Sequence, residues 1–219
     1  MRRARIAPSL LSCDLSRLRE EIASVEAAGA DLLHLDVMDG VFVPNLTFGP
    51  VLCAAARRVT GLPIEAHLMV ADADSLIEPF VRAGATHVSV HVEALIHLHR
   101  TLDRIRELGA SPGIAVNPTT SLATLDEVLP HVDFVLAMTV DPGFGGQRFI
   151  AATRDKLARL AALRDERAPH LQLAVDGGVD ADNASGLRSL GIDVLVAGTA
   201  VFAAADRLQA IRALRGEES

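Results

Sequence analysis

The stretch LHLDVMDGVFVPN, residues 33–45, places one histidine and two aspartates in a run that is otherwise apolar. Successive side chains of a β-strand point to opposite faces, so His34 and Asp36 leave the same face while Leu35 and Val37 point the other way. Burying an unpaired charge or polar group costs several kcal/mol, so these two side chains need partners. Taken alone, they fit a hydrogen-bonded pair in the core.

Similar runs recur along the chain and alternate with longer segments of helical period. The predicted strands are ARIAPSLL (4–11), DLLHLDVM (31–38), PIEAHLMV (63–70), HVSVHVEA (87–94), PGIAVN (112–117), DFVLAMTV (133–140), LQLAVDGG (171–178) and DVLVAGTA (193–200). Predicted helices lie between them, and most end in the glycine that closes a helix C-terminus. They include 16–29, 73–84, 98–109 and 155–166.

Runs that are apolar on both faces are typical of parallel strands covered by helices. About eight right-handed βα units close most economically into a (β/α)8 TIM barrel. The composition shows no shift that would indicate a linker, so we expect residues 1–219 to form one barrel domain. A doubly wound open sheet is the alternative, and it fits less well because no GxGxxG motif follows the first strand.

Polar residues recur toward the C-terminal ends of the predicted strands. Ser9 lies in the first strand, His34 and Asp36 in the second, His67 in the third and Asp176 in the seventh. In a barrel this end carries the catalytic βα loops, so residues distant in sequence converge above the axis. Two imidazoles and two carboxylates suit Zn²⁺, Mn²⁺ or Fe²⁺, which favours a metal site over a simple core pair.

Three glycine-rich loops follow the last three predicted strands. They are DPGFGGQRF (141–149), DGGV (176–179) and AGTAVF (197–202). Small residues let backbone N–H groups approach an anion, and the loops after the seventh and eighth strands of a barrel frequently bind phosphate. One such loop alone would indicate only a turn, whereas three at neighbouring strand ends favour a phosphate site.

The composition argues against several classes of partner. The formal net charge of −7 and the absence of Trp and Tyr leave neither a basic surface nor an aromatic platform for nucleic acid. No apolar run approaches the roughly 18 residues of a membrane span. Cys13 and Cys53 lack metal-ligand spacing, which suits a reducing compartment. We therefore expect a cytoplasmic protein that binds neither nucleic acid nor membrane.

Six motifs follow one another in a specific order: APSLLSCD (7–14), LHLDVMDGVFVPNLTFGP (33–50), HLMV (67–70), VDPGFGGQRF (140–149), VDGGV (175–179) and VAGTAVF (196–202). In these motifs the chain resembles the ribulose-phosphate 3-epimerase family over nearly its whole length. The resemblance implies a barrel of the ribulose-phosphate-binding type. It also implies an isomerase that interconverts D-ribulose 5-phosphate and D-xylulose 5-phosphate at C3 through an enediolate, as in the pentose phosphate pathway and the Calvin cycle.

The resemblance also implies roles for particular residues. One divalent metal ion (Zn²⁺, Fe²⁺, Mn²⁺ or Co²⁺) would be held by His34, Asp36, His67 and Asp176, with the two aspartates also acting as acid and base. An apolar cap over the reacting carbons would consist of Met38, Met69 and Met138, although core packing explains each methionine almost as well. Contacts with the substrate and its phosphate end would come from Ser9, His67, Gly143, Phe144, Gly145, Gly146, Asp176, Gly177, Gly178, Gly198 and Thr199.

Three positions depart from the family pattern. Val41 stands where a polar residue, often His, is expected, Asp141 where Asn is expected, and Thr199 where Ser is expected. Asp141 adds a negative charge near a phosphate loop. These departures leave the expected acid, base and metal residues in place.

Other phosphate-binding barrels carry different chemistry, and one residue type argues against two of them. Schiff-base aldolases and decarboxylases of the orotidine-phosphate type need a lysine, whereas the only lysine here is Lys156, in a predicted helix. An epimerase for a longer ketose such as allulose 6-phosphate would use the same metal and aspartates, so the substrate length stays open. A non-catalytic phosphate-binding scaffold would predict the loss of a carboxylate or histidine, yet all four are present.

Two further expectations concern residues outside this set. His91 and Glu93 share a strand face, and they fit either contacts behind the metal ligands or a core pair. Barrels of this type commonly associate through helices or loops, so we expect a homo-oligomer of undetermined number.

Overall fold

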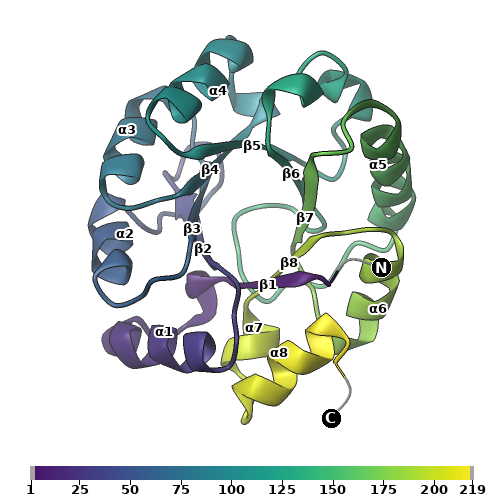
Figure 1. The fold of residues 1–219 in the computed structure, drawn as a ribbon. Helices are drawn as coiled ribbons and strands as arrows, with labels where there is room; N and C mark the ends of the chain where they lie inside the picture. The colour runs from purple at the N-terminus through teal and green to yellow at the C-terminus, as the bar shows by residue number, and fades with distance from the viewer. Residues whose placement is uncertain (1–2, 218–219) are drawn as a thin grey trace.

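The structure, a computed structural model, describes residues 3–217. Within this range eight parallel strands are hydrogen-bonded in the order β1-β8-β7-β6-β5-β4-β3-β2. Figure 1 shows them as a ring seen along its axis, with the helices outside. A parallel bridge between Ser9 and His34 joins the two ends of the sheet. The predicted (β/α)8 barrel is therefore confirmed. The strands are β1 (Arg5–Pro8), β2 (Leu33–Met38), β3 (Ile64–Met69), β4 (His87–His91), β5 (Ser111–Val116), β6 (Phe134–Met138), β7 (Gln172–Asp176) and β8 (Val194–Ala197).

Helices cover the outside of the ring; the first six connect successive strands, with one exception, and the last two follow β8. They are α1 (Leu18–Ala27), α2 (Pro50–Arg57), α3 (Asp74–Arg82), α4 (Leu98–Glu107), α5 (Thr153–Arg167), α6 (Ala181–Ser189), α7 (Thr199–Phe202) and α8 (Arg207–Arg215). Between β5 and β6 the described chain forms only the short 3-10 turns η4 (Leu122–Leu125) and η5 (Leu129–His131). Pro118 and Pro130 flank and interrupt this segment, and proline disfavours a continuous helix. Further 3-10 turns are η1 (Leu10–Ser12), η2 (Leu15–Arg17) and η3 (Val92–Ala94).

The strands divide their side chains between two apolar layers. In β2, Leu33, Leu35 and Val37 belong to the large cluster that packs the strands against the helices. Because side chains alternate, His34 and Asp36 point into the barrel. The interior also holds a smaller apolar cluster, which includes Ala7, Ala115, Leu136, Ala174, Val194 and Val196. The predicted inward placement of the polar residues of β2 thus follows from its outward leucines.

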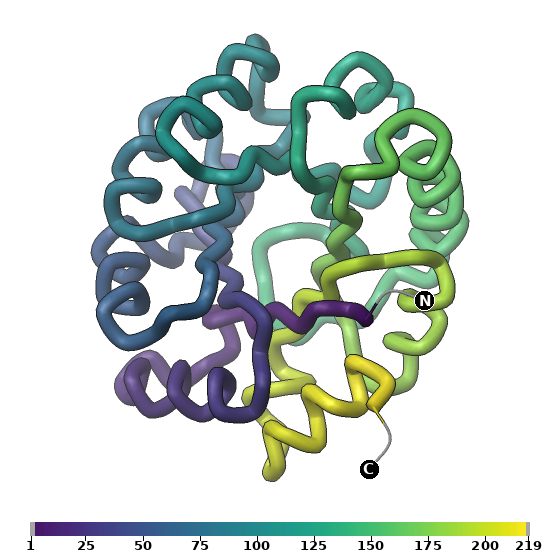
Figure 2. The backbone as a smooth tube through the Cα atoms, viewed as in Figure 1, coloured from purple at the N-terminus to yellow at the C-terminus, as the bar shows by residue number. Residues whose placement is uncertain are grey.

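The two described ends of the chain lie on one side of the barrel. In Figure 2 the start of β1 and the end of α8 are close together. An ion pair of 2.7 Å joins Arg3 to Glu217 there. Among the described residues, no helix is both long and apolar enough to cross a membrane.

Candidate active site

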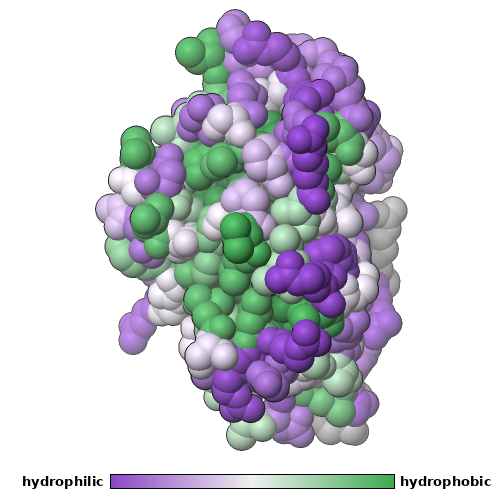
Figure 3. Space-filling model, turned by 90° about the vertical axis from the view of Figure 1, so that its left-hand side faces the viewer, coloured by the Kyte–Doolittle hydropathy of each residue, from purple (hydrophilic) through white to green (hydrophobic). Residues whose placement is uncertain are grey.

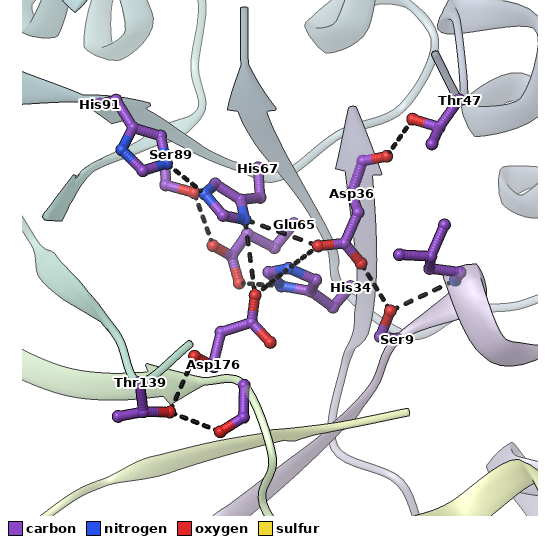
Figure 4. Close-up of polar contacts among 12 residues, drawn as sticks. Ser9, His34, Asp36, Thr47, Glu65, His67, Ser89, His91, Thr139 and Asp176 are labelled. Atoms are coloured by element: carbon purple, nitrogen blue, oxygen red, sulfur yellow. Dashed lines mark hydrogen bonds and ion pairs between the residues drawn. The ribbon is translucent and has the colours of Figure 1, made fainter. Parts of the chain in front are cut away.

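Four side chains from three strands converge inside the barrel. His34 and Asp36 come from β2, His67 from β3 and Asp176 from the end of β7. Each offers one ligand atom, and these four atoms lie within 4.8 Å of one another. Figure 4 shows the two rings and two carboxylates turned toward a common point. The structure therefore brings together the four residues that the sequence singled out from different parts of the chain.

The strand register explains this convergence. Asp36 pairs with His67 in the β2–β3 ladder. Asp176 approaches from the other side of the barrel and lies 3.7 Å from both His34 Nε2 and His67 Nδ1, measured from its Oδ2. A two-residue spacing within β2 and a register pair between β2 and β3 therefore bring His34, Asp36 and His67 together, and Asp176 reaches them from β7.

Two buried nitrogen atoms test whether the cluster fits a cation. His34 Nε2 and His67 Nδ1 are buried and have no hydrogen-bond partner. Buried polar atoms without a hydrogen bond are costly and rare, and both of these face the carboxylates of Asp36 and Asp176. Two imidazole nitrogens with two carboxylate oxygens are ligands that Zn²⁺, Mn²⁺ and Fe²⁺ accept. The residues present therefore fit a divalent cation.

The sequence analysis missed two residues, Glu65 and Ser89, that fix the orientation of the His34 ring through its Nδ1 atom. Glu65 of β3 pairs in register with His34, and its Oε2 lies 3.0 Å from His34 Nδ1. The Ser89 hydroxyl of β4 donates to the other oxygen of Glu65 at 2.8 Å. A carboxylate behind a ligating histidine orients the ring toward the metal. The signal was available, because Glu65 is an acid in an apolar run and lies two residues before His67.

His91 and Glu93 lie behind the second histidine. His91 Nε2 is 2.9 Å from His67 Nε2, and His91 Nδ1 is 3.0 Å from Glu93 Oε2. Of the two arrangements expected from the sequence, the structure thus places the pair against a residue of the cluster.

The two aspartates have opposite pKa shifts. Burial raises the pKa of Asp176, the neighbouring Asp36 carboxylate raises it further, and it reaches about 7. Burial acts in the same direction on Asp36, but His34 and His67 outweigh it and lower the pKa of Asp36 below its usual value. Without a cation, Asp176 is therefore the carboxyl that more readily holds a proton.

The two histidines also differ. Burial lowers the pKa of His67 to about 4, which keeps this ring neutral. Burial opposes protonation of His34 too, but Asp36 and Glu65 raise its pKa well above the usual value. A proton and a divalent cation compete for the same Nε2 lone pair, so cation binding would displace the proton from His34.

A cavity of about 540 Å³ opens above the cluster. Such a volume accommodates a small ligand. His34 and His67 do not line it and lie fully buried beneath it, whereas Asp36 and Asp176 do line it. The Ser9 hydroxyl also lines it and donates to Asp36 Oδ2 at 2.5 Å. The other lining residues that the sequence predicted are Met38, Met69, Met138, Gly143, Phe144, Gly145, Gly146, Gly177, Gly178, Gly198 and Thr199.

The cavity has an apolar part beside the aspartates. Met38 and Met69 pair in register and pack with Val43. Met138 lies in register with Asp176 on the neighbouring strand. All three methionines are nearly inaccessible to solvent yet line the cavity, so they restrict water beside the two carboxylates.

Glycine is required in the loop that follows β7, which also lines the cavity. Gly177 and Gly178 have φ of 116° and 65°, in the left-handed region. A Cβ on Gly178 would lie 2.3 Å from the backbone nitrogen of Phe149, so the β7–α6 loop touches the β6–α5 loop directly. The sequence analysis gave no role to Arg148, which adds a positive charge to the lining.

The departures from the family pattern lie differently with respect to the cavity. Thr199 lines it, whereas Val41 and Asp141 are exposed and lie outside its lining. The Asp141 carbonyl accepts a hydrogen bond of 2.6 Å from Gln147 Nε2. The extra charge of Asp141 is therefore carried on the solvent side of the loop.

Comparison with known proteins gives a consistent result. The model of the ribulose-phosphate 3 epimerase family matches residues 5–202. Ribulose-phosphate 3-epimerase from Bacillus subtilis (strain 168) is 45% identical over 215 residues, which cover 98% of this chain and 99% of that protein. Ribulose-phosphate 3-epimerase 1 from Cupriavidus necator is 48% identical over 209 residues, covering 94% of this chain and 87% of that protein.

Solved structures with low sequence identity share the fold. The 3-hexulose-6-phosphate synthase from Salmonella typhimurium superimposes with a TM-score of 0.75 at 19% identity, covering 97% of each chain. KGPDC from Streptococcus mutans has a TM-score of 0.75 at 16% identity, covering 99% of this chain and 97% of that one. At these identities the likeness supports the barrel alone.

Proposed function

The chain belongs to the ribulose-phosphate 3-epimerase family, and from this premise we propose that it interconverts D-ribulose 5-phosphate and D-xylulose 5-phosphate at C3. The observation that carries the proposal is the pair Asp36 and Asp176. The two carboxyls come from strands on different sides of the barrel and line one cavity above two buried histidines. This arrangement allows a proton to be removed from one face of a carbon and returned to the other.

The reaction needs one group on each face of C3. One carboxylate removes the proton at C3 and leaves an enediolate, and the other carboxyl gives a proton to the opposite face. In the reverse direction the two residues exchange roles.

Four residues would hold a divalent cation, namely His34, Asp36, His67 and Asp176. When bound, the cation would supply Lewis-acid stabilisation of the negative charge that develops on the substrate oxygens. The Ser9 hydroxyl, which donates to Asp36, orients that carboxylate and can reach the substrate in the same cavity.

The rest of the cavity would position the ketose phosphate. Met38, Met69 and Met138 present an apolar wall beside the aspartates, which excludes water and strengthens the electrostatic interactions there. The glycine-rich loops after β6, β7 and β8 leave room for backbone N–H groups to approach the phosphate.

Proton NMR in D₂O tests this function. The Co²⁺-loaded protein is mixed with ribulose 5-phosphate, and the C3 signal is followed together with the formation of xylulose 5-phosphate. Deuterium incorporation at C3 with formation of xylulose 5-phosphate is the expected result. If neither occurs although the protein has bound metal, the proposed substrate is wrong, and allulose 6-phosphate is the next ketose to test.

A further inference from the structure

A chain of polar side chains runs from His67 to the loop that follows β5. His67 Nε2 lies 2.9 Å from His91 Nε2, and His91 Nδ1 lies 3.0 Å from Glu93 Oε2. Glu93 Oε1 accepts from the backbone N–H of Asn117 at 2.8 Å and from the Thr120 hydroxyl. The proton transfers described above use neither His91 nor Glu93.

The hydrogen bonds in this chain have one consistent direction. His67 Nδ1 faces the two carboxylates of the cluster and has no hydrogen-bond partner, so its lone pair is the one available to a cation. The ring proton of His67 then lies on Nε2, and His91 Nε2 must accept it, because two ring nitrogens in contact share one proton. The ring proton of His91 itself therefore lies on Nδ1, from which it donates to Glu93.

The chain is also held firmly in place. His67 and His91 are fully buried, and their rings are 24° from parallel with centroids 5.1 Å apart. The ring of Phe42 packs on His91 with its centroid at 4.7 Å. Glu93 uses both carboxylate oxygens, one toward His91 and one toward the β5–η4 loop. These contacts leave His91 one orientation that satisfies both of its nitrogens.

Lys156 anchors the far end of the chain. Its Nζ in α5 donates to the carbonyl of Asn117 at 2.6 Å and lies 3.4 Å from the carbonyl of Pro118. The same residue, Asn117, gives its N–H to Glu93. The loop that donates to Glu93 is thus also hydrogen-bonded to α5 on the outside of the barrel. This second contact holds the loop, and with it the Glu93 carboxylate, in place.

We propose that His91 and Glu93 are positioning residues that fix the tautomer and ring orientation of His67 as a metal ligand. The inference rests on the proposed function, since it takes the cation at the cluster as given. A carboxylate behind a ligating histidine orients the ring and raises its basicity, and losing such a partner typically lowers metal affinity about 10- to 100-fold. Glu65 does this directly for His34, whereas Glu93 acts on His67 through one additional ring.

The first test compares Co²⁺ binding by the full-length wild type and E93Q, with the dissociation constant measured by competition with a chelator. A glutamine amide has one acceptor oxygen and one donor nitrogen, so in either orientation its NH₂ group faces a donor, at His91 Nδ1 or at the Asn117 N–H. We expect E93Q to bind Co²⁺ about 10- to 100-fold more weakly and with an altered visible absorption spectrum.

E21Q is the matched control. Glu21 is also buried and accepts hydrogen bonds, from Arg207 at 2.9 Å, but it lies in α1 and does not belong to the cluster. Its loss should lower the melting temperature while leaving Co²⁺ affinity and the absorption spectrum unchanged. The comparison separates a positioning role from general destabilisation by a buried Glu→Gln change.

A second pair of variants tests the direction of the hydrogen bonds even if E93Q does not fold. H91F leaves His67 Nε2–H without an acceptor, whereas the amide oxygen of H91Q can replace the accepting nitrogen. We expect H91F to lose Co²⁺ affinity and H91Q to retain more of it than H91F.

Wild-type Co²⁺ affinity and spectrum in folded E93Q and H91F would overturn the inference and leave His91 and Glu93 as core residues. In that case wild-type turnover would leave the proposed function intact. If the wild type itself fails to bind Co²⁺, the metal site in the proposed function is wrong, and the positioning role falls with it.

Discussion

Asp36 and Asp176 perform the proposed proton transfers, so replacing either one should abolish them. In D36N and D176N a neutral amide replaces a carboxylate of nearly the same shape, and an amide cannot accept the C3 proton. Loss of a general acid or base typically costs about 10²- to 10⁴-fold in rate. We expect kcat to fall at least about 10²-fold in both variants, as measured by the conversion of ribulose 5-phosphate followed by NMR.

The control for these variants is D126N. Asp126 pairs with Arg167 at 2.8 Å on the surface, away from the cavity. D126N should retain wild-type kcat, and circular dichroism should show that D36N and D176N keep the barrel fold. Normal turnover in either active-site variant would contradict the acid and base assignment.

The raised pKa of Asp176 predicts how the stability of the cation-free protein depends on pH. Its folded-state pKa of about 7 exceeds the usual 3.8, so the native state binds this proton more tightly than the unfolded chain. This contribution to stability is complete below the usual pKa and is lost as pH rises through about 7. Between about pH 5 and about pH 8, the melting temperature of chelator-treated wild type should therefore fall more than that of chelator-treated D176N. Parallel curves for the two proteins would contradict the shift.

Single residues of the site could be predicted from the sequence to different degrees. His34, Asp36 and His67 were detectable because each is a polar residue in an apolar strand. Glu65 is also a polar residue in an apolar strand, but it was missed. Its partner is His34 Nδ1 in the adjacent strand, and only the register of β2 and β3 reveals that contact. The direction of the His67–His91 hydrogen bond likewise needed coordinates, since it depends on which nitrogen faces the cluster.

At the scale of elements, the contact between two glycine-rich loops predicts a selective effect on substrate binding. In G178A the new Cβ would meet the Phe149 backbone at 2.3 Å, at a φ of 65° that L-residues rarely adopt. The β7–α6 and β6–α5 loops must then separate at the proposed phosphate end. We expect a higher KM for ribulose 5-phosphate and about 1–3 kcal/mol lower stability, from steady-state kinetics and thermal unfolding.

G61A provides a comparison for this substitution. A Cβ on Gly61 meets no atom within 4 Å and its φ is not in the left-handed region. G61A should leave KM and stability close to wild type. An unchanged KM in G178A would show that the loop contact does not shape the phosphate end.

The strands could be predicted better than their connections. All eight strands lie within the predicted runs except for the first residue of β5, but several runs extended too far. The predicted run ARIAPSLL (4–11), for example, extends beyond β1, which ends at Pro8. The Ser9 side chain accepts a hydrogen bond from the Leu11 N–H, and the turn η1 begins there. Apolar composition alone does not distinguish the end of a strand from a buried turn.

At the scale of the whole molecule, the barrel could be predicted because every strand is apolar toward the helices. Its interior is less regular, since apolar residues fill one part and ionisable residues the other. A polar interior at one end of a barrel is stable only if its groups have partners. The same inward-pointing strand positions therefore determine both the interior of the barrel and the residues of the site. A prediction of the fold is for this reason also a prediction of the site.

The expected homo-oligomer stays a prediction. Val41, Leu46 and Val51 are 76%, 76% and 83% exposed. Figure 3 shows broad apolar areas on the side of the barrel where α2 and α3 lie. Large exposed apolar patches mark interaction surfaces. We expect light scattering to give a mass above that of one chain and V51E to lower it, and a monomeric wild type would contradict the prediction.

Removal of the cation should affect the whole barrel, because its proposed ligands come from β2, β3 and β7. A ligand that binds only the folded state at 100 times its dissociation constant stabilises that state by about 2.7 kcal/mol. For a chain of this size, we expect Co²⁺ to raise the melting temperature of chelator-treated protein by about 5–10 °C.

The increase should depend on the cluster and on no other histidine. H67Q removes one proposed ligand, so it should lose most of the Co²⁺-dependent increase, whereas H99Q alters an exposed histidine on α4 and should keep it. Calorimetry of the three proteins with and without Co²⁺ measures both effects. An equal increase in wild type and H67Q would place the bound ion elsewhere, because a cation that joins three strands cannot lose a ligand from one of them without losing stabilisation.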